Sequence, residues 1–146
     1  MAKPIYVLNG PNLNMLGLRE PAIYGSDSLD DVRKKAEARA TALALTIDFR
    51  QSNNEGELVS WIQEARDKAQ AIILNAGAYS HTSIAVLDAL QAAELPVIEV
   101  HLSNIFRREP YRQHSYVSQA AKGVICGLGA KGYELALEAL ADLLAS

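Results

Sequence analysis

The sequence predicts a doubly wound α/β fold with one five-stranded parallel sheet in the order 2-1-3-4-5. Five short apolar or β-branched runs alternate along the chain with stretches of helical periodicity. The runs read as continuous apolar segments, which is typical of parallel strands buried on both faces. The length of 146 residues fits one domain, so we expect residues 1–146 to form a single unit.

The predicted strands cover residues 4–8, 45–50, 71–74, 97–100 and 123–126. The predicted helices cover residues 29–43, 55–69, 80–93 and 130–145, with a short helical turn at 116–121. Ser28 precedes the first helix, and Asp30 and Asp31 occupy its first turn. Asn54 precedes the second, with Glu57 in the capping-box position.

Composition excludes several classes of protein. An apolar share of 49% with 21% charged residues indicates a soluble globular chain. The net charge of -3 argues against a broad surface for nucleic acid or membrane. Because the first residues lack a leader pattern and no apolar run is long enough to span a bilayer, we expect a cytoplasmic protein. Cys126 lies in the apolar run GVIC and is predicted to be a buried, inert thiol.

Polar residues follow each predicted strand. Ligands of doubly wound folds bind beyond the carboxyl ends of the strands, so these residues form a candidate site. They are Asn9, Gln51, Ser52, Asn53, Asn75, Gly77, His101, Ser103, Gly127 and Gly129. The connections 9–25 and 101–118 are unusually long, which favours binding loops or lids.

The first long connection offers a candidate lid. Gly17 and Gly25 bracket Arg19 and Tyr24, so this part can swing. The alternative is an ordinary surface loop with a solvated arginine and a packed tyrosine.

The second long connection combines an acid pair with basic residues. Glu99 and His101 alternate on one strand face, so the carboxylate can fix the tautomer of the imidazole and keep it protonated as an acid. Arg107, Arg108 and Arg112 follow within six residues and can bind an anionic substrate through a carboxylate or phosphate. The alternative is an exposed basic turn that needs no ligand.

Two further polar residues are candidates for binding hydroxyl groups. Asn75 ends a strand, and His81 begins the third predicted helix; both can instead be simple caps. A metal site built from Glu99, His81 and His101 is disfavoured, because no HExxH spacing supports it and nearby arginines repel cations. His114 is predicted to be a surface residue.

Other chemistries lack support. The stretch GLGAKG matches GxGxxG but lies too near the chain end for a dinucleotide-binding unit, so we predict a tight turn and a helix start. No lysine has a setting that suits Schiff-base chemistry, and no GxSxG elbow is present.

Three segments resemble the signature segments of the type II 3-dehydroquinate dehydratase family: LNGPNLNMLGLREPAIYG (8–25), NAGAYSHTSIAVLDAL (75–90) and EVHLSNIFRREPYRQHS (99–115). The resemblance extends to GVICGLGAKGY before the last helix. Met15 stands where the family usually has Leu, and Ala76 where many members have Pro; we expect both to affect only local packing.

The resemblance implies a flavodoxin-like fold and the dehydration of 3-dehydroquinate to 3-dehydroshikimate in the shikimate pathway, which leads to chorismate and aromatic amino acids. It implies anti elimination through an enolate, with no metal or organic cofactor. By position, Tyr24 matches the base and Arg19 its partner on the lid, while Asn12 matches the residue that orients a water or the enolate. His101 matches the acid, and Glu99 the residue that orients it.

The resemblance also implies the substrate-binding residues and the assembly. The expected binding residues are Asn75, His81, Asp88, Leu102, Ser103, Arg108 and Arg112, with Leu102 and Ser103 acting through their backbone. Arg108 is expected to lie close to Tyr24. The family assembles as trimers that associate into homododecamers, and Asp88 is expected to reach the site of a neighbouring subunit.

A tyrosine base requires help from its surroundings. A free tyrosine has a pKa of about 10, and lowering it to about 7 takes roughly 4 kcal/mol of preferential phenolate stabilisation. Arg19 and Arg108 are the candidates to supply it. The alternative function is that of a flavodoxin-like nucleotide- or anion-binding protein without catalysis.

Overall fold

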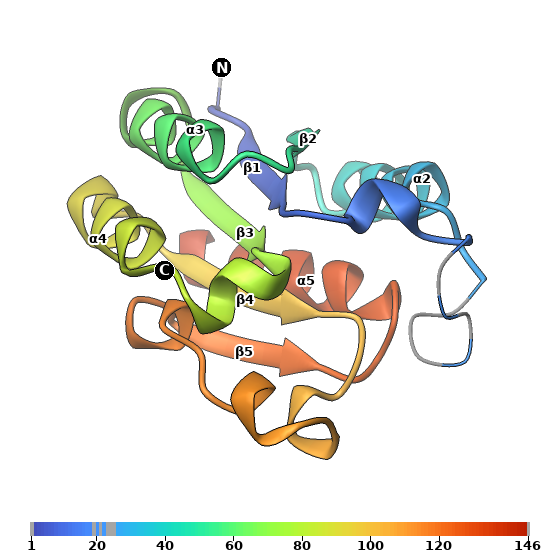
Figure 1. Ribbon diagram of the computed structural model, residues 1–146. Helices are drawn as coiled ribbons and strands as arrows, with labels where there is room; N and C mark the ends of the chain where they lie inside the picture. Colours follow the sequence, from blue (N-terminus) through green and yellow to red (C-terminus); the bar gives the residue numbers. More distant parts are fainter. Residues whose placement is uncertain (1, 19, 21, 23–25, 146) are drawn as a thin grey trace.

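A parallel sheet of five strands forms the centre of the computed structural model, which describes residues 2–18, 20, 22 and 26–145 (Figure 1). The strand order β2-β1-β3-β4-β5 confirms the predicted order, and every pair of neighbours is parallel. The strands are β1 (Ile5–Asn9), β2 (Ile47–Gln51), β3 (Ala71–Asn75), β4 (Val97–His101) and β5 (Gly123–Cys126).

Four of the strands end one residue later than the apolar pattern predicts. Their last residues are Asn9, Gln51, Asn75 and His101, which were expected to follow the strands. Ladder hydrogen bonds join backbone groups, so a residue with a polar side chain can still belong to a strand. The register sets Asn9 beside both Gln51 and Asn75, and these polar side chains therefore end their strands at the same level.

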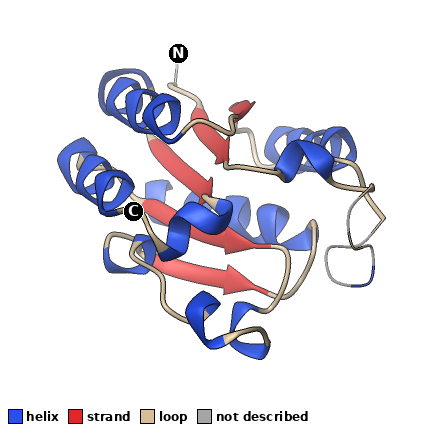
Figure 2. Ribbon diagram, in the orientation of Figure 1, coloured by secondary structure: helices blue, strands red, loops and turns tan. Residues whose placement is uncertain are grey.

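Two pairs of helices cover the two faces of the sheet. The helices are α2 (Leu29–Ala42), α3 (Glu55–Lys68), α4 (Ile84–Ala93) and α5 (Lys131–Ala145). One apolar core lies between the sheet and α2 with α5, and the other lies between the sheet and α3 with α4. Figure 2 shows the helices on both sides of the strands, and the arrowheads of β3, β4 and β5 point toward the same end.

Ser28 and Asn54 cap their helices as predicted, but the capping box forms at α2 and not at α3. The Ser28 side chain accepts from the Asp31 backbone N–H, and the Asp31 side chain accepts from the Ser28 N–H, which completes a capping box. At α3, Asn54 accepts from the Glu57 N–H, but the predicted capping box with Glu57 is wrong, because the Asn54 N–H donates to the Ser52 hydroxyl at 2.9 Å and not to the Glu57 side chain. These bonds satisfy amide groups that have no partner within the helix.

The predicted helix over residues 80–93 is wrong in its first turn. Residues Gly77–His81 form a separate 3-10 helix, η2, and α4 begins only at Ile84 behind the Ser83 cap. The Ser83 hydroxyl accepts from the Val86 N–H at 2.9 Å, which fixes this start. His81 therefore ends η2 and does not begin a helix.

Two other expectations need correction. β2 is half-buried along its whole length because it forms an edge of the sheet, so full burial holds for β1, β3 and β4 but not for β2 or β5. Cys126 is also half-buried on the edge strand β5, not fully buried. No helix in the described part of the chain is both long and apolar enough to cross a membrane.

Candidate active site

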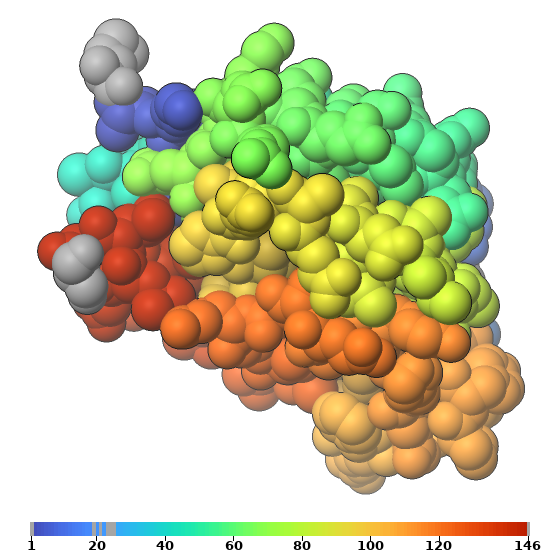
Figure 3. Space-filling view, turned by 90° about the vertical axis from the view of Figure 1, so that its left-hand side faces the viewer, coloured from blue at the N-terminus to red at the C-terminus, as the bar shows by residue number. Residues whose placement is uncertain are grey.

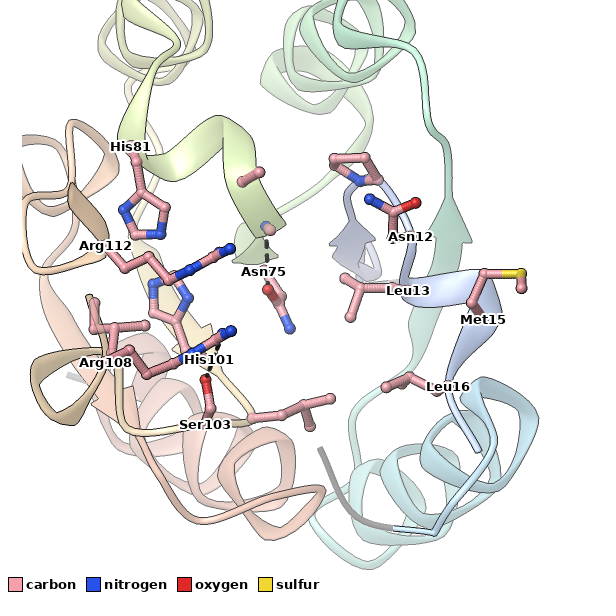
Figure 4. Close-up of a pocket in the computed structure, with 15 residues that line it drawn as sticks. Asn12, Leu13, Met15, Leu16, Asn75, His81, His101, Ser103, Arg108 and Arg112 are labelled. Carbon is pink, nitrogen blue, oxygen red and sulfur yellow. Dashed lines mark hydrogen bonds between the residues drawn. The ribbon is translucent and has the colours of Figure 1, made fainter. Parts of the chain in front are cut away.

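A cavity of about 180 Å³ lies beyond the carboxyl ends of β1, β3 and β4 (Figure 4). In this view His81, His101, Arg108 and Arg112 line one side, while Asn12, Leu13, Met15 and Leu16 line the other. Asn75 lies between the two sides. The cavity therefore faces a basic wall on one side and a mainly apolar wall on the other.

The mainly apolar wall depends on a close approach between the backbone after β1 and the end of β3. The Gly10 N–H donates to the Asn75 carbonyl at 2.8 Å, and a Cβ atom at Gly10 would lie only 2.3 Å from the Ala76 carbonyl oxygen. Only glycine fits such a contact. The crossing brings Pro11 and Asn12 to the end of β3, and Asn12 adopts a left-handed conformation with φ of 68°.

The polar residues at the end of β2 support this loop and do not line the cavity. Gln51 donates to the Gly10 carbonyl at 3.2 Å, and the Asn53 side chain accepts from the Asn12 N–H at 2.9 Å. Ser52 accepts from the Asn54 N–H. Their predicted membership of the site is wrong for direct contact, because Gln51 and Asn53 hold the Asn12 loop and Ser52 supports the start of α3.

Asn9 is likewise an internal support. It is fully buried, and its side-chain oxygen accepts a hydrogen bond from the Tyr133 hydroxyl at 2.6 Å. The Asn75 amide donates to the same hydroxyl at 3.0 Å, and the Asn75 oxygen accepts from the Gly77 N–H at 3.2 Å. Tyr133, in the first turn of α5, thus fixes the orientation of a residue in the cavity wall. The only sequence signal for this network is a tyrosine on an apolar helix face, which does not indicate a polar partner.

Glu99 and His101 lie side by side on β4, as the alternation along the strand predicts. His101 Nε2 and the Glu99 carboxylate lie 2.5 Å apart, with Glu99 fully buried and His101 5% exposed. Burial raises the pKa of Glu99, but hydrogen bonds from His101, Ser115 and Ser118 and the charge on His101 outweigh it, so the pKa lies below the ordinary value. Because Nε2 is hydrogen-bonded to Glu99, Nδ1 is the ring nitrogen that can form a hydrogen bond with a group in the cavity.

Ser115 and Ser118 complete the surroundings of this carboxylate, and sequence reasoning missed both. Their hydroxyls donate to Glu99 at 2.6 Å and 2.5 Å. Serines in a polar loop carry no pattern that predicts contact with a strand 16 and 19 residues away.

His81 lies above His101 in the cavity wall. The two rings are stacked with centroids 6.3 Å apart, and His81 Nδ1 lies 2.7 Å from the His114 carbonyl oxygen. Burial is the main cause that lowers the pKa of His81, with nearby His101 and Arg112 adding to it. The neutral ring donates from Nδ1, so its Nε2 can accept a hydrogen bond from a hydroxyl group. The His114 side chain is exposed, as predicted.

Two of the three predicted arginines line the cavity. Arg108 donates to the Ser103 hydroxyl at 3.5 Å, and Arg112 donates to Glu109 at 2.6 Å. Hydrogen bonds from Tyr111 and Arg112 lower the pKa of Glu109 to about 2. Arg107 is exposed and lines only a neighbouring surface hollow, so its expected place in the same cluster is wrong. The turn is therefore not merely an exposed basic surface.

The other predicted residues divide into three groups. Leu102, Ser103 and Met15 line the cavity, and the effect of Met15 on local packing stays a prediction. Asp88 lies on the exposed side of α4 and does not line the cavity of its own chain. Arg19 and Tyr24 lie outside the described residues.

Glycines after β5 shape the adjoining backbone. Gly127 and Gly129 have φ of 87° and 60°, and their N–H groups donate to the carbonyls of His101 and Leu102. The predicted tight turn before α5 is confirmed, and it supports the cavity wall from behind. Among the described residues, no three His, Cys, Asp or Glu side chains are grouped so that they could hold a metal ion.

Comparison with known proteins relates this chain to one family over almost its whole length. The family model for dehydroquinase class II matches residues 3–141. The 3-dehydroquinate dehydratase of Phenylobacterium zucineum is 62% identical over 98% of this chain and 99% of its own length. That of Caulobacter vibrioides is 57% identical over 99% of both chains.

A solved structure shares the same architecture. The type II dehydroquinase of Propionibacterium acnes superposes with a TM-score of 0.93 at 47% identity, covering 97% of this chain and 98% of that one. Since this agreement includes almost the whole chain, it applies to the sheet, the helices and the connections around the cavity together.

Proposed function

We propose that this chain, which belongs to the class II dehydroquinase family, dehydrates 3-dehydroquinate to 3-dehydroshikimate as a carbon–oxygen lyase of the shikimate pathway. The observation that carries the proposal is the Glu99–His101 pair opening on a cavity lined by Arg108 and Arg112, within a fold matched over residues 3–141. The cavity offers an acid and an anion-binding wall, which this substrate requires.

His101 acts as the acid that protonates the departing hydroxyl. Loss of hydroxide from carbon is slow unless a proton accompanies it, and a positioned imidazolium supplies one. The buried Glu99 carboxylate, 2.5 Å from Nε2, fixes the orientation of the ring, so that Nδ1 is the nitrogen available to the substrate. The proposal thus assigns catalysis to His101 and orientation to Glu99.

The remaining cavity residues hold the substrate. Arg112, with Arg108 beside it, binds the carboxylate, since guanidinium groups suit planar anions. Asn75 and the neutral His81 ring bind hydroxyl groups, and the backbone of Leu102 and Ser103 adds further contacts.

Proton removal is assigned to the first loop. Tyr24 is the base, with Arg19 as its partner and Arg108 close to it, and these assignments are supported by the family resemblance. Asn12, held at the cavity edge by Asn53, orients a water or the enolate oxygen. The elimination proceeds by anti geometry through an enolate.

The proposal extends to the setting of the enzyme. The reaction needs no metal or organic cofactor, because proton transfer and charge stabilisation suffice for it. The family supports a homododecamer, built as a tetramer of trimers, in which the exposed Asp88 contacts a neighbouring site. The cytoplasmic location, the single catalytic domain and the absence of nucleic-acid partners stay predictions from the sequence.

A direct assay separates this function from its rival. Purified protein mixed with 3-dehydroquinate should produce the absorbance of the conjugated enone, and the trace should persist in the presence of a metal chelator. His101→Ala should lose that activity but retain substrate binding, because the arginines remain. A flavodoxin-like nucleotide- or anion-binding protein without catalysis would bind ligand and give no absorbance change.

A further inference from the structure

The carboxylate of Glu99 is enclosed by the connection that follows β4. Its Oε2 atom lies 2.6 Å from the Ser115 hydroxyl and 2.5 Å from His101 Nε2, and its Oε1 atom lies 2.5 Å from the Ser118 hydroxyl. The Glu99 side chain is fully buried. Both carboxylate oxygens therefore accept hydrogen bonds. Of the three donors, His101 lies on β4, and the two serines lie on the connection after it.

We propose that Ser115 and Ser118 are positioning residues that keep Glu99 ionised and fixed, so that His101 carries its proton toward the cavity. This inference rests on the proposed function, in which His101 is the acid. Neither serine lines the cavity, so both act through Glu99 and do not contact substrate.

Charge balance explains why such donors are needed. A buried carboxylate loses its hydration and takes up a proton unless hydrogen bonds replace the water. A protonated Glu99 no longer attracts the charge on His101. Hydroxyl groups donate to the anion without adding a positive charge that would repel the protonated His101 ring, which lies against the same carboxylate. The direction of the Glu99 pKa shift agrees with this role.

The rest of the connection holds the serines in place. Between them Val117 is fully buried in the core shared with α3 and α4, and the Tyr116 N–H donates to the Ser80 carbonyl at 2.8 Å. Figure 3 shows this connection (orange) packed against the α4 region (yellow). The same connection supplies Arg112 and the carbonyl that contacts His81. One anchored segment therefore supports both the acid and the anion-binding wall.

The ionisation of Glu99 tests the proposal directly. In protein carrying ¹³C-labelled glutamate side chains, the Glu99 signal is identified by its loss in Glu99→Gln and is followed against pH. Ser115→Ala and Ser118→Ala should each raise the titration midpoint by about one pH unit, since hydrogen bonds to charged groups are the stronger ones. The double variant should raise the midpoint further. Ser118→Thr, which keeps the hydroxyl, should leave the midpoint at the wild-type value.

A matched serine controls for lost stability. Ser83 is also buried and donates nothing to Glu99, because its hydroxyl caps α4. Ser83→Ala should destabilise the fold but leave the Glu99 midpoint unchanged. Ser118 is the more exposed of the two proposed residues, so Ser118→Ala provides a folded variant even if Ser115→Ala does not fold.

Kinetics provide the second readout. Each single variant should lower kcat about tenfold with KM changed less than twofold, because the acid is affected but the binding groups are not. A midpoint that stays within 0.2 pH units of the wild type in Ser118→Ala would overturn the inference. The titration uses no substrate, so an inactive wild-type protein would refute the proposed function without deciding the role of the serines.

Discussion

Replacing Tyr133 by Phe removes one hydroxyl group at the point where β1 and β3 meet α5. That hydroxyl donates to Asn9 at 2.6 Å and accepts from Asn75 at 3.0 Å, and the two asparagines are 0% and 3% exposed. The ring itself remains, so no cavity forms. The cost therefore comes from the two polar atoms that lose their partner.

The expected loss follows from those two atoms. A buried polar group left without a partner costs about 1–3 kcal/mol, so Tyr133→Phe should lower the free energy of unfolding by about 3 kcal/mol. For a chain of this size that is a fall in Tm of roughly 9 °C. Because the Asn75 amide is also freed to rotate, kcat/KM should fall about tenfold.

Calorimetry and steady-state kinetics measure the two effects. Tyr79→Phe is the matched control, since the Tyr79 hydroxyl donates to the carbonyl of the exposed residue Asn53, where water can replace it. Its Tm should fall by less than about 2 °C. If Tyr133→Phe were no more destabilised than this control, the buried network would not hold Asn75 as described.

Three further perturbations test other parts of the structure. Gly10→Ala should prevent normal folding, seen as lost near-ultraviolet circular dichroism, because its Cβ would lie 2.3 Å from the Ala76 oxygen; a native spectrum would contradict the close approach. Ser28→Ala should cost about 1 kcal/mol in urea unfolding through loss of the capping box with Asp31, and an unchanged midpoint would argue against that cap. The lowered pKa of His81 means that the unfolded chain binds more protons, so stability should fall as the pH drops below about 6.5. His81→Gln should flatten this dependence in urea titrations between pH 8 and 5, and an equally steep slope would exclude His81 as its source.

The sheet order was predictable because the strands are recognisable from their apolar composition. Apolar runs of four or five residues alternated with amphipathic stretches, and parallel sheets bury such runs on both faces. The pattern failed at strand ends, where Asn75 and His101 continue the ladder despite polar side chains. It also failed before α4, because helical periodicity does not distinguish the 3-10 turn ending at His81 from the helix after Ser83.

The site was predictable where residues close in sequence act together. Glu99 and His101 alternate on one strand, which places both side chains on one face. Contacts over long sequence distances left no such signal. Tyr133 lies 58 residues from Asn75 and 124 from Asn9, so only the packing of α5 on the sheet reveals their network.

The stereochemistry of water loss tests the central account most directly. The substrate is 3-dehydroquinate with deuterium on one face of the carbon that lies between the ketone and the carbon that loses hydroxide. Anti elimination removes the hydrogen on the face opposite the departing hydroxyl, and His101 protonates that hydroxyl. With wild-type protein, deuterium on that opposite face should be lost from the product by mass spectrometry, while deuterium on the other face should be retained. Retention of the first label, or no product at all, would contradict the assignment.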